Sequence, residues 1–161
     1  MSDPAPSAGE ADSVDAVAST LNQLIQTCKD GEQGFQAAAA GVDDLNLQRL
    51  LESYSQQRSE FAAELQLEVE RLAQDPAQSG HLSASLHRGW INIRSVVAGR
   101  EESAIIAECE RGEDAAVSAY QEALTSPLPQ DLRAMVERQF IKVKEAHDQI
   151  RSLEEVHSRH R

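Results

Sequence analysis

Apolar residues recur at alternating steps of three and four in four long stretches of this chain, and this spacing constrains the fold more than any other feature. Residues three and four apart lie on one face of an α-helix, so each stretch predicts a helix with one buried stripe. The stripes begin at Val14, Leu47, Ile105 and Leu132. Because no stretch follows the two-residue period of a half-buried strand, the pattern predicts an all-α protein.

The composition agrees with helices and excludes some classes of partner. Only five Pro and eight Gly occur in 161 residues, so long runs contain no helix breaker. The formal net charge is −12, and the basic residues cluster only at residues 157–161. A nucleic-acid surface needs a larger basic patch than this. No apolar run approaches the roughly 20 residues of a membrane span. We therefore expect no nucleic-acid partner and no membrane association.

Loop-forming residues divide the chain into segments. Residues 1–13 are rich in Pro, Ala, Ser and acids and show no period, so they are predicted to be a disordered tail. The stripes and breakers predict helices over about 14–40, 44–73, 82–98, 101–125 and 131–157. The segment 82–98 is too short for a full bundle member, so we place it in a long connection between two helical hairpins.

Two hairpins joined by one long connection define a particular kind of bundle. Short loops make the helices within each hairpin antiparallel, and the connection lets the segment 101–125 run parallel to the segment 44–73. Ferritin-like four-helix bundles have this single long crossover. The predicted fold is therefore an all-α, antiparallel, ferritin-like four-helix bundle over about residues 14–157, with a short extra helix in its crossover.

An internal repeat supports the two-hairpin organisation. At an offset of 81 residues, the sequence C-x-x-G-E occurs twice, from Cys28 to Glu32 and from Cys109 to Glu113. A glycine inside a helix costs about 1 kcal/mol relative to alanine and so needs a reason. We predict that the first and third long helices pack closely near Gly31 and Gly112.

Each long helix also has one metal-capable side chain on or beside its inner stripe. These residues are Glu32, Glu64, Glu113 and His147. Dimetal carboxylate bundles use one Glu from each of two helices and a Glu-x-x-His motif from each of the other two. Here the motif is broken twice, because Leu67 stands where the first His is needed and Lys144 where the second Glu is needed. The four candidates would suffice for one Fe, Mn or Zn ion.

A second interpretation of the same residues involves no metal. Arg58 also lies on an inner stripe and could neutralise Glu32, Glu64 or Glu113 directly. A buried Glu–Arg network would then be a satisfied polar core. The sequence leaves both interpretations open. It contains no Ser-His-Asp set, phosphate-binding loop or dinucleotide motif, so no catalytic residues are assigned.

Three further residues have a structural and a functional interpretation. Trp90, in the sequence His-Arg-Gly-Trp, could be a packing anchor or part of a small recognition surface for a protein partner. Cys28 and Cys109 are expected to be buried small apolar residues, with a redox pair as the alternative.

Four stretches together resemble a known family. They are LNQLIQTCKDGEQGF (21–35), RSEFAAEL (58–65), LHRGW (86–90) and ERGEDAAVSAY (110–120). They are similar to a bacterial family of ferritin-like four-helix-bundle proteins, known chiefly as a domain of unknown function and distantly similar to rubrerythrin-like proteins. The resemblance implies a bacterial, cytoplasmic, stress-associated setting, and no site residue can be carried over from it.

Two functions follow as hypotheses. The first is a non-catalytic bundle with a degenerate dimetal centre, self-associating as a homo-oligomer. The second is a metal-binding protein that uses the Glu and His residues of the core.

Overall fold

The computed structural model describes residues 8–72 and 89–159, and most of these residues are helical. The elements in these ranges are α1 (Ala8–Gly41), α2 (Leu45–Arg71), α4 (Ile93–Gly99), α5 (Glu102–Thr125) and α6 (Gln130–Arg159). No strand occurs among the described residues. The predicted all-α class is confirmed.

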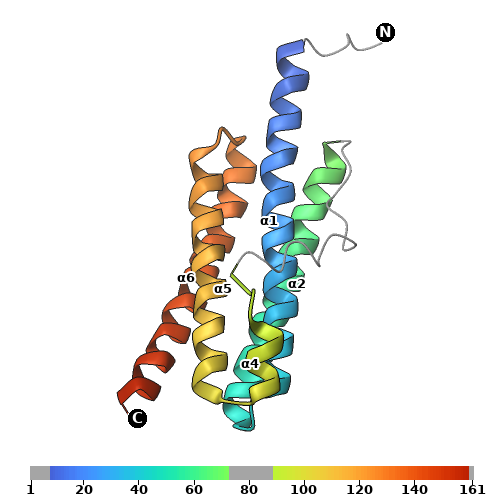
Figure 1. Cartoon of the computed structure of the whole chain (residues 1–161). Helices are drawn as coiled ribbons and strands as arrows, with labels where there is room; N and C mark the ends of the chain where they lie inside the picture. Colours follow the sequence, from blue (N-terminus) through green and yellow to red (C-terminus); the bar gives the residue numbers. More distant parts are fainter. Residues whose placement is uncertain (1–7, 73–88, 160–161) are drawn as a thin grey trace.

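The helices form two antiparallel hairpins, α1 with α2 and α5 with α6 (Figure 1). Helix α1 also packs against α5, so the two hairpins meet along these helices. Helices α2 and α5 run in the same direction, and α4 lies against α1 and α5 at the end of the bundle where α5 begins (Figure 1). The described part of the chain therefore has the predicted connectivity of two hairpins and one long crossover.

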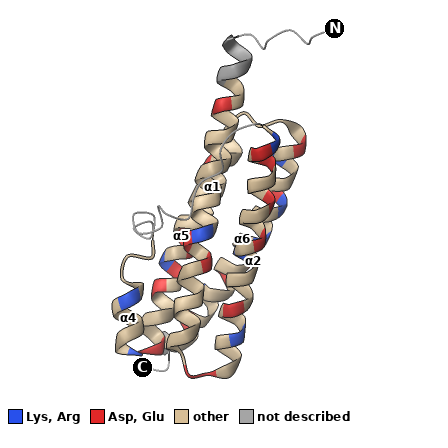
Figure 2. Cartoon of the chain, turned by 90° about the vertical axis from the view of Figure 1, so that its right-hand side faces the viewer, with Lys and Arg blue, Asp and Glu red and all other residues tan. Residues whose placement is uncertain are grey.

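The position of α1 explains its unusual composition. Residues 16–28 contain no charged side chain, whereas α2 and α6 have charges of both signs along their lengths (Figure 2). Because α1 packs against both α2 and α5, it has little surface left for solvated charges. No helix in the described ranges has the length and apolar character needed to cross a bilayer.

Side chains at two loops satisfy helix ends that would otherwise lack partners. The Asp44 carboxylate accepts the backbone N–H groups of Asn46 and Leu47, at 2.8 and 3.0 Å, and so caps α2. At the other end of the bundle the Arg133 guanidinium donates to the carbonyls of Leu124 and Ser126, at 2.7 and 2.9 Å. Arg133 therefore links the start of α6 to the last turn of α5.

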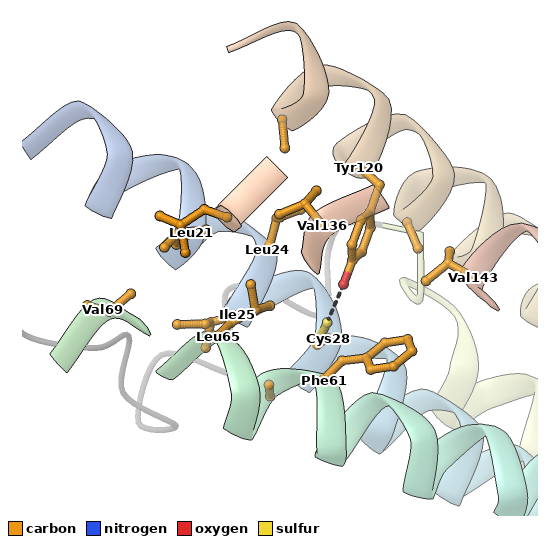
Figure 3. Close-up of a cluster of buried hydrophobic side chains, with 14 of the residues drawn as sticks. Leu21, Leu24, Ile25, Cys28, Phe61, Leu65, Val69, Tyr120, Val136 and Val143 are labelled. Atoms are coloured by element: carbon orange, nitrogen blue, oxygen red, sulfur yellow. Dashed lines mark hydrogen bonds between the residues drawn. The ribbon is translucent and has the colours of Figure 1, made fainter. Parts of the chain in front are cut away.

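The core consists of two apolar clusters with a polar layer between them. We call the first the upper cluster, and it combines one half of each long helix, including Leu24, Leu65 and Val136 (Figure 3). The lower cluster combines the other halves with the crossover, including Phe35, Trp90 and Ile106. Arg58 and Glu113 lie between the residues of the two clusters on α2 and α5, and together with polar side chains at the adjoining part of the upper cluster they form the polar layer described below.

Two predicted boundaries are corrected. Helix α1 begins at Ala8, so residues 8–13 are helical and only residues 1–7 of the expected tail lie outside the described ranges. Ala and Glu favour helix and no Pro follows Pro6, so the helix extends at little cost. The expected helix 82–98 is corrected over its described part, because residues 89–92 are not helical and α4 begins at Ile93. Gly89 has φ +103, a backbone conformation outside the right-handed helical region. Residues 82–88 lie outside the described ranges.

Candidate functional site

A buried ion pair occupies the centre of the bundle. The Arg58 guanidinium of α2 donates from both terminal nitrogens to the two carboxylate oxygens of Glu113 on α5, each at 2.6 Å. The two side chains are 1% and 0% exposed. Burial disfavours the charged guanidinium, but the Glu113 charge and its hydrogen bonds outweigh burial and raise the pKa of Arg58. The pair is a bidentate, fully enclosed salt bridge.

Two residues of α1 accommodate Arg58, one by its lack of a side chain and the other by contact with its aromatic ring. A Cβ at Gly31 would lie 3.2 Å from Nη1 and 3.3 Å from Cγ of Arg58, so the glycine lets the arginine pass along α1. The guanidinium carbon lies 5.4 Å from the centroid of the Phe35 ring, within cation–π range. The predicted pairing of Arg58 with a core glutamate is confirmed for Glu113.

A hydrogen-bonded chain from α1 through α5 and α6 completes the polar layer. The Tyr120 hydroxyl donates to the Gln139 side-chain oxygen at 2.7 Å, and the Cys28 sulfur lies 3.1 Å from the same hydroxyl (Figure 3). Because the hydroxyl has one hydrogen and gives it to Gln139, the Cys28 thiol donates to Tyr120. The Gln139 amide donates in turn to Glu64 at 3.3 Å and to the Phe61 carbonyl at 3.4 Å. All four long helices therefore contribute to the layer.

Burial keeps the two thiols protonated. It raises the pKa of Cys28 to about 11 and that of Cys109 well above the ordinary value. Both cysteines are free and buried, as predicted.

We expect native protein at about pH 8 to react with a thiol reagent at least roughly a hundredfold more slowly than a free thiol, because thiolate is the reactive form. Two equivalents should react in denaturant. Fast reaction of either thiol in the native state would contradict this burial.

The four metal candidates predicted from sequence do not come together. Glu113 is held by Arg58, whereas Glu64 pairs near the surface with Arg138 at 2.5 Å. Glu32 is half-buried and lines a polar groove of about 460 Å³ on the α1–α2 side. Of the four, only His147 belongs to a group with metal-ligand spacing.

That group lies at the edge between α5 and α6. One ligand atom each of Glu110, Asp114 and His147 lies within 4.8 Å of the others. Nε2 of His147 is 2.6 Å from an Asp114 oxygen, and Nδ1 is 3.1 Å from Asp148. His147 is buried, while Asp114 and Asp148 are exposed. We call Glu110, Asp114 and His147 the edge cluster.

Sequence reasoning missed two members of the edge cluster because they lie off the apolar stripe. Glu110 and Asp114 are four residues apart, so they share a helix face, and they flank the inward-facing Glu113 on the side of α6. That spacing was the available signal. Gln139 was also missed, although it lies 81 residues after Arg58 and thus in register with the internal repeat.

Helix α5 also contacts the crossover. Trp90 is 2% exposed, so its interpretation as a packing anchor is confirmed and it offers no surface to a partner. A Cβ at Gly112 would lie 2.1 Å from the indole, and one at Gly34 would lie 2.3 Å from it. The prediction for the repeat glycines is therefore corrected: Gly112 makes room for Trp90 and Gly31 for Arg58. Neither serves chiefly to bring the backbones of α1 and α5 together.

A comparison with protein-family models shows which family the chain belongs to. The model described as Domain of unknown function (DUF2383) matches residues 16–126, from within α1 to just beyond α5. These residues include Arg58, Glu113 and both repeat motifs. No curated protein gives a significant match. Because the model covers more than half of the chain, this protein belongs to the DUF2383 family, a domain of unknown function.

Proposed function

We propose that this chain is a non-enzymatic bundle of the ferritin-like kind that binds one divalent metal ion at the α5–α6 edge, through Glu110, Asp114 and His147. The proposal rests on the spacing of their ligand atoms, all within 4.8 Å of one another. One imidazole and two carboxylates suit Fe, Mn or Zn better than Ca or Mg, which prefer oxygen ligands alone.

The hydrogen bonds of His147 favour such a role. Metal-binding histidines usually donate their second ring N–H to a carboxylate, which fixes the tautomer and the ring orientation. Asp148 lies where it can accept from Nδ1, which leaves Nε2 facing Asp114. The hydrogen bond with His147 lowers the pKa of Asp148, so this carboxylate stays ionised as an acceptor.

Metal binding at this position must compete with a hydrogen bond. Nε2 of His147 and the Asp114 oxygen are 2.6 Å apart. An ion bound to both atoms must displace the hydrogen that they share. The described residues supply three protein ligands here, which leaves coordination positions for water.

Titration of metal-free protein with Zn²⁺ or Mn²⁺ in a calorimeter tests the site. We expect one ion per chain, no binding in His147→Ala, and a loss of affinity of roughly tenfold or more in Asp148→Asn. His157→Ala is the matched control, because His157 pairs with Glu102 across the same two helices at 2.6 Å. Unchanged binding in His147→Ala, or equal loss in the control, would refute the assignment.

The non-enzymatic part of the proposal rests on the central salt bridge. A fixed guanidinium charge lies mid-bundle and both oxygens of Glu113 are engaged by it, so a cation cannot use Glu113 without displacing Arg58. We expect the protein to oxidise Fe²⁺ no faster than a buffer blank and to keep its metal content in folded Glu113→Gln. Metal loss in that variant would put the ion at the centre instead.

The setting of the protein is also proposed. Two free, buried thiols are compatible with a reducing bacterial cytoplasm, and the stress association rests on sequence resemblance alone.

We further propose that the chain forms homo-oligomers through exposed helix faces. Light scattering after size-exclusion chromatography would refute self-association if it gave the monomer mass at all concentrations.

A further inference from the structure

Among the contacts of the crossover with the bundle, one large side chain lies in a slot formed by glycines. The Trp90 indole lies between Gly34 of α1 and Gly112 of α5, where added Cβ atoms would lie 2.3 and 2.1 Å from the ring. The indole and the Phe35 ring meet edge to face, with ring centroids 5.1 Å apart and planes at 73°. Any residue other than glycine at either position would occupy the space that the indole now fills.

The residues next to Trp90 contact the same part of α5. A Cβ at Gly89 would lie 2.8 Å from the Arg111 carbonyl oxygen, so this residue too must be glycine at its positive φ. The backbone N–H of Asn92 donates to the buried carboxylate of Glu108. These contacts between residues 89–92 and α5 all involve residues 108–115 of α5.

The four long helices are held together by other contacts. The upper cluster contains residues of α1, α2, α5 and α6 and none of the described crossover. The bidentate pair of Arg58 and Glu113 also joins α2 to α5 without it. Losing the indole from its slot therefore leaves these contacts in place.

We propose that Trp90 is a plug whose release frees residues 89–92 from α5 without unfolding the four long helices, and that the vacated slot binds a flat aromatic ring. Proteins open locally in units that are less stable than the whole, and such a unit needs a core that survives its loss. The upper cluster and the central salt bridge provide that core.

The surroundings of the slot favour an aromatic occupant. A cavity of about 260 Å³ borders Trp90 and Gly112, and it is lined further by small apolar residues (Ala115, Ala116 and Ala119) and by polar ones (Thr27, Asp30, Ser118 and Glu122). Release of the indole would join this cavity to the slot. Phe35 would remain beside the slot and could contact a bound ring edge to face, a geometry that aromatic rings prefer.

Urea unfolding of the wild-type protein gives the first test. Trp90 is the only tryptophan, so its fluorescence reports on the slot alone, while far-UV circular dichroism reports on all helices. We expect the fluorescence transition at a lower urea concentration than the dichroism transition. Coincident transitions would overturn the proposal, because the crossover would then belong to the same cooperative unit.

Two glycine variants give the second test. Gly112→Ala should expel the indole, shifting its emission to the red and increasing its quenching by acrylamide, with helical ellipticity near that of the wild type. Gly99→Ala is the matched control, since a Cβ there would meet nothing within 4 Å. Loss of ellipticity together with the fluorescence change in Gly112→Ala would overturn the proposal.

The ligand part of the proposal is tested with free indole. Trp90→Gly should be stabilised by indole in a saturable way, as apolar cavities bind rings of matching shape. Wild-type protein should bind indole more weakly, because the ring must first replace Trp90 in the slot. No saturable stabilisation of Trp90→Gly would overturn the binding of a ring in the slot.

Discussion

Replacing Arg58 alone with methionine is expected to lower the free energy of unfolding by roughly 3–5 kcal/mol, the cost of removing one partner of a buried pair. The cause is the remaining Glu113 carboxylate, which is fully enclosed and would lose both of its hydrogen-bond donors. Urea unfolding followed by circular dichroism measures the change. A loss below about 1 kcal/mol would mean that water or another group reaches Glu113.

The double variant Arg58→Met with Glu113→Leu separates the charge from the packing. With both charges removed and the volume retained, stability should return close to that of the wild type, because apolar residues can replace a buried ion pair at little cost. Arg138→Met is the surface control. It breaks the exposed pair with Glu64 and should cost less than about 1 kcal/mol.

Phe35→Ala is expected to cost roughly 3–5 kcal/mol, which makes it the second large effect. Phe35 is fully buried and contacts the indole of Trp90 and the ring of Tyr54, at centroid distances of 5.1 and 5.4 Å. It also lies under the Arg58 guanidinium. Its removal leaves a cavity beside both the slot and the salt bridge, and thermal or urea unfolding measures the loss.

Phe140→Ala provides the comparison for that prediction. Phe140 is partly buried and stacks on Tyr120 at 6.4 Å, so its loss creates less enclosed space. We expect a destabilisation well below that of Phe35→Ala. Equal effects would show that Phe35 has no role beyond its apolar volume.

The helices and the central salt bridge could be predicted from the sequence because both depend on helical periodicity. Arg58 and Glu113 lie on inner stripes, and a charged residue on a stripe must find a partner inside. Glu32 and Glu64 lie at the borders of their stripes. The spacing of apolar residues fixes the direction of a side chain around the helix only to about the width of the stripe. It therefore could not distinguish a half-buried side chain from one that points into the core.

The glycine slot and the edge cluster could not be predicted, for a different reason. A glycine shows that space is needed but not which side chain needs it, so Gly112 suggested a neighbouring helix when its partner was Trp90. The edge cluster joins α5 to α6 through residues off the apolar stripes. Only the relative rotation of the two helices brings His147 beside Asp114, and no single helix determines that rotation.

The spacing of Arg58 and Gln139 has a consequence for how the two halves of the chain can resemble each other. These residues are 81 apart, in register with the repeated C-x-x-G-E, and both are fully buried. Arg58 is paired with Glu113, whereas the corresponding Glu32 is half-buried at the polar groove. Gln139 instead donates to Glu64, which is already paired with Arg138 near the surface. The two halves therefore share a backbone plan while one supplies a buried cation and the other a neutral amide.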